Sequence, residues 1–136
     1  MSSRTNPTVA VLMGGPSAER EVSLASGRAC AAALREHGGY NVIEVDAGPY
    51  LASVMAEMKP DAALNCLHGR WGEDGCVQGL LEWMQIPYTH SGVLSSALAM
   101  DKEATKAAYR AHGLPVVESV LSSRDEVRSR HVMAPP

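Results

Sequence analysis

Two glycine-rich segments hold most of the side chains in this sequence that are suited to chemistry. The first, residues 14–21, reads GGPSAERE and directly follows an apolar run. The second, residues 68–79, reads HGRWGEDGCVQG and sets a histidine, an arginine and two carboxylates among glycines. Glycine allows a ligand to come close to the backbone, and free N–H groups at the start of a following helix favour anions. The two segments therefore predict a binding site for a small charged molecule.

Glu19 is the residue of the first segment with the clearest chemical use, and two interpretations of it stay open. A carboxylate on this loop can hold a substrate ammonium by charge-assisted hydrogen bonds. Alternatively, Glu19 and Glu21 only stabilise the helix that follows, because carboxylates interact favourably with the positive N-terminal end of a helix. The glycine spacing is neither GxGxxG nor GxxxxGK[ST], so it does not indicate a dinucleotide fold or a P-loop.

His68 opens the second segment, where it can serve a charged substrate as a hydrogen-bond donor or proton carrier. In the alternative interpretation the segment is a capped turn, and Glu73 and Asp74 begin the next helix. A metal site is not indicated, because no second histidine or cysteine stands at ligand spacing. Lys102, just after a capping Asp101, either reaches a phosphate or is simply solvated.

The elements that must position these residues alternate along the chain. The apolar run at 8–13, stopped by a glycine pair, predicts a buried strand. A helix is expected over about 21–37, with one apolar stripe made of Val22, Ala25, Ala29, Ala33 and Leu34. Further strands are predicted at 40–46, 61–68, 87–89 and 116–121, and further helices at 51–59, 77–84, 93–100, 102–112 and from the capping box at Ser123.

This alternation predicts an α/β fold, a Rossmann-like three-layer domain with a mainly parallel sheet. Ligands of such sheets bind beyond the carboxyl ends of the strands, and both glycine-rich segments fall there.

Bulk composition narrows the class of protein. The 136 residues are 46% hydrophobic and 20% charged, as in a globular domain, and the formal net charge of −3 leaves no basic footprint for nucleic acid. No apolar run approaches the roughly 20 residues of a membrane-spanning helix. Three cysteines without CxxC spacing and a polar start without a signal sequence predict free thiols in the cytoplasm.

The two segments, in this order and at this distance, resemble the D-alanine–D-alanine ligase family. The similarity runs through residues 9–23 and continues through residues 68–79, where the pattern HGxxGEDGxxQG is intact. It returns in residues 87–93 and 96–102, so recognisable segments span most of the chain.

The resemblance implies a reaction and roles for four residues. ATP phosphorylates the carboxylate of one D-alanine, and the amine of a second D-alanine attacks the acyl phosphate. Glu19 then binds the ammonium of the first D-alanine and Val22 packs against its methyl group. His68 lies near the substrate carboxylate and the transferred phosphate, and Lys102 contacts the nucleotide. The family is ATP-dependent, uses Mg²⁺ or Mn²⁺, and is typically a homodimer through this domain.

The resemblance also divides the chain. Residues 1–100 are expected to form the Rossmann-like, pre-ATP-grasp substrate domain, and residues 101–136 the start of a central ATP-grasp region. Because an apolar stretch begins where the chain stops at Pro136, we expect an N-terminal fragment that is inactive alone. The ATP-grasp lysines, the magnesium ligands and the transition-state arginine would lie in the remainder.

Three other functions stay open. A related ligase joins D-alanine to D-lactate or D-serine, and the residues that choose the second substrate lie largely beyond Pro136. The chain also suits a non-catalytic dimerisation module. A flavodoxin-like nucleotide-binding module fits least well.

Overall fold

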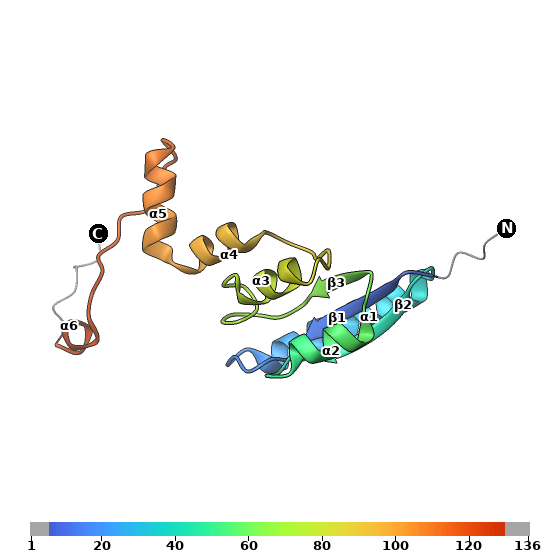
Figure 1. Cartoon of the computed structure of the whole chain (residues 1–136). Helices are drawn as coiled ribbons and strands as arrows, with labels where there is room; N and C mark the ends of the chain where they lie inside the picture. The colour runs from blue at the N-terminus through green and yellow to red at the C-terminus, as the bar shows by residue number, and fades with distance from the viewer. Residues whose placement is uncertain (1–5, 130–136) are drawn as a thin grey trace. The chain divides into compact units, whose positions relative to one another are not determined.

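The computed structural model describes residues 6–129, which divide into two compact units (Figure 1). The first unit ends at Lys102 and the second begins at Glu103. The elements, in chain order, are β1 (Thr8–Met13), α1 (Arg20–His37), β2 (Asn41–Asp46), α2 (Leu51–Met58), β3 (Ala62–Asn65), α3 (Cys76–Trp83), α4 (Val93–Met100), α5 (Lys102–Ala111) and α6 (Arg124–Arg128). No helix within these residues is both long and apolar enough to cross a membrane.

The sheet has three parallel strands in the order β2-β1-β3. Thr8 pairs with Asn41 at one end of β1, and Met13 pairs with Asp46 at the other. The chain passes from β1 to β2 through α1 and from β2 to β3 through α2, because consecutive parallel strands need a crossover connection. The predicted α/β class with a parallel sheet is confirmed.

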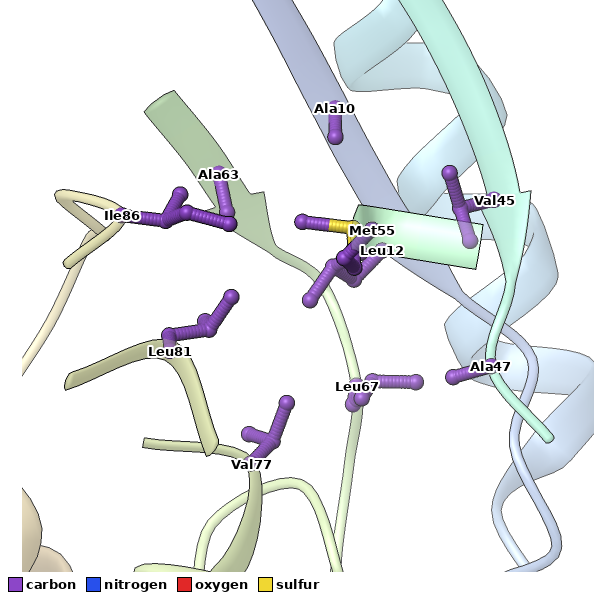
Figure 2. Packing of buried hydrophobic residues seen from close by; sticks show 10 residues of the cluster. All are labelled: Ala10, Leu12, Val45, Ala47, Met55, Ala63, Leu67, Val77, Leu81 and Ile86. Atoms are coloured by element: carbon purple, nitrogen blue, oxygen red, sulfur yellow. The ribbon is translucent and has the colours of Figure 1, made fainter. Parts of the chain in front are cut away.

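One face of the sheet is covered by α2 and α3. Leu12 and Met55 are completely buried there, and Leu81 from α3 is equally inaccessible. Figure 2 shows these side chains converging from β1, α2 and α3. Burying an aliphatic side chain contributes roughly 1.5–3 kcal/mol, so this cluster is a main source of stability for the first unit.

The opposite face is covered by α1, which makes the domain three-layered. The side chains that α1 turns inward are small: Ser23, Gly27 and Ala31 are buried. A Cβ built on Gly27 would lie 2.5 Å from the Cβ of Met13, so the helix backbone runs directly over β1.

The apolar stripe predicted for this helix was wrong. Val22, Ala25, Ala29 and Ala33 are exposed, and only Leu34 of that set packs partly against the core. Close approach to β1 selects residues with little side chain, and hydrophobicity alone does not identify such positions.

The outer edge of β3 is covered by residues 87–90 rather than by a full strand. Ala63 N donates to Pro87 O at 2.8 Å, and Thr89 N donates to Ala63 O at 3.2 Å. The Thr89 hydroxyl accepts from Asn65 N, and the His90 Nε2–H donates to Asn65 O at 2.9 Å. The strand predicted at 87–89 is therefore reduced to a single parallel bridge between Ala63 and Tyr88.

In the second unit the strand predicted at 116–121 is absent: these residues have no regular structure, and Val117 and Leu121 are over four-fifths exposed. No strand among the described residues pairs with this segment, and β propensity without a partner does not make a strand. The capping box is confirmed, because Ser123 Oγ accepts from Glu126 N while the Glu126 carboxylate accepts from Ser123 N. Whether this unit begins an ATP-grasp region stays a prediction.

Candidate functional site

The loop between β1 and α1 is fixed by a turn and an ion pair. Gly14 and Gly15 have φ of 74° and 78°, which is the left-handed region that favours glycine. Asp46, at the end of β2, receives two hydrogen bonds from the Arg20 guanidinium, which lower the pKa of that carboxyl. The pair anchors the first turn of α1 to the neighbouring strand.

Ser17 and Glu19 bring this loop against the second glycine-rich segment. Ser17 Oγ donates to His68 O at 2.8 Å and accepts from Glu19 N at 3.1 Å. A Cβ built on Gly69 would lie 2.4 Å from Glu19 Oε2, so the carboxylate rests on the Gly69 backbone. The two segments predicted to form one site therefore meet, and residues 50 positions apart in sequence become neighbours.

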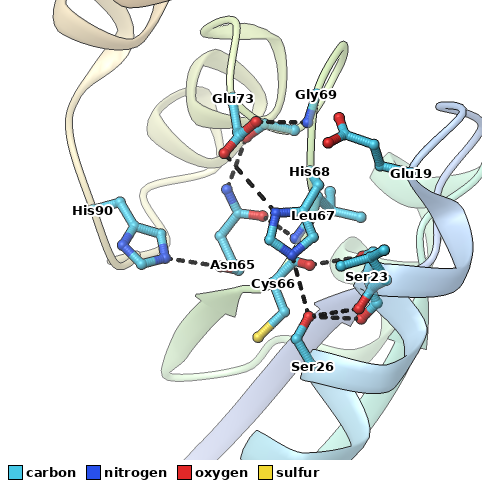
Figure 3. Close-up of polar contacts among 12 residues, drawn as sticks. Glu19, Ser23, Ser26, Asn65, Cys66, Leu67, His68, Gly69, Glu73 and His90 are labelled. Atoms are coloured by element: carbon cyan, nitrogen blue, oxygen red, sulfur yellow. Dashed lines mark hydrogen bonds and ion pairs between the residues drawn. The ribbon is translucent and has the colours of Figure 1, made fainter.

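The imidazole of His68 lies between a hydroxyl and a carboxylate (Figure 3). Its Nε2 is 3.2 Å from Ser26 Oγ, and its Nδ1 is 4.0 Å from Glu73 Oε1. The ring is about one third exposed, so it is held on two sides and remains accessible to a ligand.

The 69–75 loop is held by polar side chains of its own and of the elements on either side of it. Asp74 accepts from Trp71 N and Cys76 N. Its burial opposes ionisation, but these hydrogen bonds outweigh that effect and lower the pKa of the Asp74 carboxyl. The Gly72 carbonyl receives bonds from the buried amides of Asn65 and Gln78. These hydrogen bonds fix the conformation of the loop that directly follows His68.

A cavity of about 320 Å³ opens beside His68. His68, Glu73, Ser95 and Ser96 line it together with His90. His90 has φ of 77°, a conformation that favours glycine, and its ring is committed to the Asn65 carbonyl. The cavity has the size for a small metabolite, and a few polar side chains of its lining could orient one.

The four predicted site residues do not all lie close together in the structure. Glu19 and His68 flank Gly69. Val22, 60% exposed, follows Glu19 by less than one turn of α1. Lys102 is exposed at the first residue of α5 and is not among the residues that contact His68 or line the cavity.

Sequence reasoning missed two serines of α1. Ser23 is buried and donates to Cys66 O at 2.6 Å, which ties α1 to the end of β3, and Ser26 contacts the His68 ring. Glu19, Ser23 and Ser26 fall at i, i+4 and i+7, so one polar stripe on the helix would have revealed them. Within residues 6–129 no group of three His, Cys, Asp or Glu side chains is arranged to hold a metal ion.

Comparison with known proteins bears on what this site does. The profile of the family described as D-ala D-ala ligase N-terminus matches residues 50–91. A D-alanine–D-alanine ligase of Ruegeria sp. (strain TM1040) is 69% identical over 135 residues, 99% of this chain. This chain belongs to the D-alanine–D-alanine ligase family. It spans 44% of the length of that relative.

Solved ligase structures agree. The D-alanine–D-alanine ligase of Bacillus anthracis superposes with a TM-score of 0.70 at 37% identity, over 79% of this chain and 35% of the ligase. The same ligase has also been solved as a complex with ATP, with the same TM-score and identity. The likeness covers the greater part of the chain, and both structures carry the same enzyme name.

Proposed function

We propose that this chain supplies the D-alanine-binding half of an ATP-dependent D-alanine–D-alanine ligase. The observation that carries the proposal is the meeting of Glu19 with the His68–Gly69 backbone at the carboxyl edge of the sheet. A carboxylate and an imidazole on either side of one glycine suit a small zwitterion, whose ammonium and carboxylate need opposite partners.

In the proposed reaction the D-alanine carboxylate attacks the terminal phosphorus of ATP, forming an acyl phosphate and releasing ADP. The amine of a second D-alanine then attacks the acyl carbon, and phosphate leaves. Glu19 accepts hydrogen bonds from the first ammonium, and Val22 contacts the methyl group. His68 donates toward the carboxylate as negative charge develops there. We assign Lys102 a contact with the nucleotide, supported by its exposure at the start of α5.

Magnesium would neutralise phosphate charge in such a reaction. The described residues lack a cluster of carboxylates and histidines that fits a metal ion, so we derive no step through magnesium from this chain. We likewise propose that the isolated chain is inactive, because it spans less than half of the ligase relatives it matches.

The test is Glu19→Gln in an intact ligase that carries this chain, with phosphate release from ATP measured as D-alanine is varied. The amide keeps the shape but loses the charge, and we expect kcat/KM to fall on the order of a hundredfold or more, as when a charged group loses its partner. Glu21→Gln, on the exposed surface of α1, is the matched control and should behave as the parent. Near-normal kcat/KM for Glu19→Gln would refute the assignment.

Acceptor choice separates the related ligases. Product analysis with D-alanine, D-lactate and D-serine as competing acceptors should give D-alanyl-D-alanine as the main product. A preference for D-lactate or D-serine would leave the site assignment standing and change the name of the reaction.

We also propose a cytoplasmic homodimer that pairs through this domain. Trp83 and Leu94 are 90% and 80% exposed, which suits side chains that another subunit covers. Sedimentation at high micromolar concentration should show a dimer; a strict monomer would contradict this part of the proposal.

A further inference from the structure

We propose that Glu73 is a positioning residue for both halves of the site, acting on His68 with one carboxylate oxygen and on the backbone beneath Glu19 with the other. The inference rests on the proposed function for its catalytic consequence, but its geometric content stands on the contacts alone.

The first contact is with the backbone. Glu73 Oε2 accepts a hydrogen bond from Gly69 N at 2.6 Å. Gly69 is buried, with φ of 67°, and its Cα side faces the Glu19 carboxylate. A displacement of Gly69 would move the surface on which Glu19 rests, so Glu73 fixes the spacing between the two halves.

The second contact is with the ring. Glu73 Oε1 faces His68 Nδ1 at 4.0 Å, just beyond hydrogen-bond distance (Figure 3). An ionised carboxylate only accepts, so this neighbour favours a proton on Nδ1.

The other ring nitrogen supports the same orientation. Ser26 Oγ lies 3.0 Å from Val22 O and 3.2 Å from Ser23 O, and carbonyl oxygens can only accept. The single hydroxyl proton goes to one of these carbonyls, which leaves an oxygen lone pair to accept from His68 Nε2–H at 3.2 Å. Whichever ring nitrogen carries the proton, an oxygen that can accept faces it, so the two contacts hold the orientation of the ring.

Starting the next helix does not account for Glu73. That role belongs to Asp74, which accepts from Cys76 N at the first residue of α3 and from Trp71 N. Within residues 6–129 the polar partners of the Glu73 carboxylate are instead two groups next to the site, Gly69 N and the His68 ring.

The experiment uses an intact ligase that carries this chain, labelled with ¹⁵N-histidine, in parent, Glu73→Gln and Asp74→Asn forms. The amide of Glu73→Gln can still accept from Gly69 N, but it then presents NH₂, a donor, toward Nδ1. We expect the His68 Nδ1 signal, assigned by its loss in His68→Gln, to shift in Glu73→Gln. Asp74→Asn, which removes the same charge from the same loop, should leave it in place.

A double-mutant cycle gives the catalytic readout. Glu73→Gln should lower kcat/KM on the order of a hundredfold, the size expected for a misplaced catalytic group, with most of the loss in kcat. In a His68→Gln background the same substitution should change kcat/KM less than about twofold, because residues that act through one another are not additive.

The outcomes separate this inference from the proposed function. An unshifted Nδ1 signal, or fully additive losses, would overturn the positioning role even in an active ligase. A shifted signal in a protein that makes no D-alanyl-D-alanine would support the positioning role and refute the function. Thermal unfolding of each variant distinguishes loss of the fold, and Glu73→Asp, which keeps the charge on a shorter arm, should restore part of the rate if charge at Nδ1 is what matters.

Discussion

Replacing Gly27 by alanine tests whether α1 is held against β1 by close backbone contact. In an ordinary helix this change would stabilise by about 1 kcal/mol, because alanine is the better helix former. Here the new Cβ would lie 2.5 Å from the Cβ of Met13 and 3.1 Å from its Cε. The two effects have opposite signs, so the sign of the result is informative.

The size of the effect follows from which atom is struck. Carbon atoms pack at about 3.5–4.0 Å, so the contact would be too close by about 1–1.5 Å. The Met13 Cε can rotate away, but its Cβ is fixed to β1, and relief requires α1 to shift. Overpacking of this kind costs about 1–3 kcal/mol. Because the Met13 Cβ cannot move away, we take the upper part of that range, about 2–3 kcal/mol. After subtracting the gain in propensity of about 1 kcal/mol, we expect a net destabilisation of about 1–2 kcal/mol.

Urea unfolding followed by circular dichroism would measure it. With an m-value of about 1–3 kcal/mol/M, the midpoint should fall by roughly 0.3–2 M. Gly48→Ala is the matched control, since nothing lies within 4 Å of a Cβ built there, and it should leave the midpoint unchanged or slightly raised. If Gly27→Ala were as stable as the parent, the helix and strand would not be in the close contact described.

Three further predictions concern buried groups and the loop. Ser23→Ala leaves the Cys66 carbonyl without the hydroxyl bonded to it at 2.6 Å, and should lower the free energy of unfolding by about 1–2 kcal/mol; a loss within the error of urea titration would show that the bond matters little. At pH 8 a disulfide reagent should modify exposed Cys76 in the folded chain and spare Cys66, because burial raises the pKa of the Cys66 thiol to about 12 and leaves almost no thiolate; equal labelling of both thiols, mapped by mass spectrometry, would contradict the burial. Asp74 has a pKa below its ordinary value, so its stabilising effect is complete above the unfolded pKa of about 3.9 and is lost as pH falls through the lower folded value; the gap in urea midpoint between parent and Asp74→Asn should therefore be wide at pH 7 and close in acid, and a gap that did not depend on pH would refute it.

Much of the first unit could be predicted from its sequence because its signals are local. The run that forms β1 is apolar throughout and stops at two glycines, and the structure places the strand at the predicted residues, Thr8–Met13. The helices at 51–58 and 93–100 likewise begin where their patterns do. Local pattern also located the two glycine-rich loops, because glycine clusters mark turns and loops between regular elements.

The inward face of α1 could not be predicted by the same means. Ser23, Gly27 and Ala31 are chosen by the distance to β1, a tertiary quantity, while more apolar neighbours such as Val22 point outward. The strand prediction for residues 116–121 was wrong for a related reason, because β-branched residues form a strand only where a partner strand is present. The contacts of Glu73 depend on how the 69–75 loop folds back, which residue types do not specify.

The covering of β3 by residues 87–90 also has a consequence for solubility. An open strand edge offers unpaired N–H and C=O groups to any other chain, and such edges are where proteins associate into extended sheets. Here the Thr89 hydroxyl accepts from the backbone N–H of Asn65, and the His90 ring donates to its backbone carbonyl. These side chains satisfy the strand edge without offering a new edge to which a further strand could pair. At the far edge, β2 carries the exposed charges of Glu44 and Asp46. Loosening residues 87–90 would expose the backbone groups of β3 to pairing with another chain, without unfolding of the whole domain.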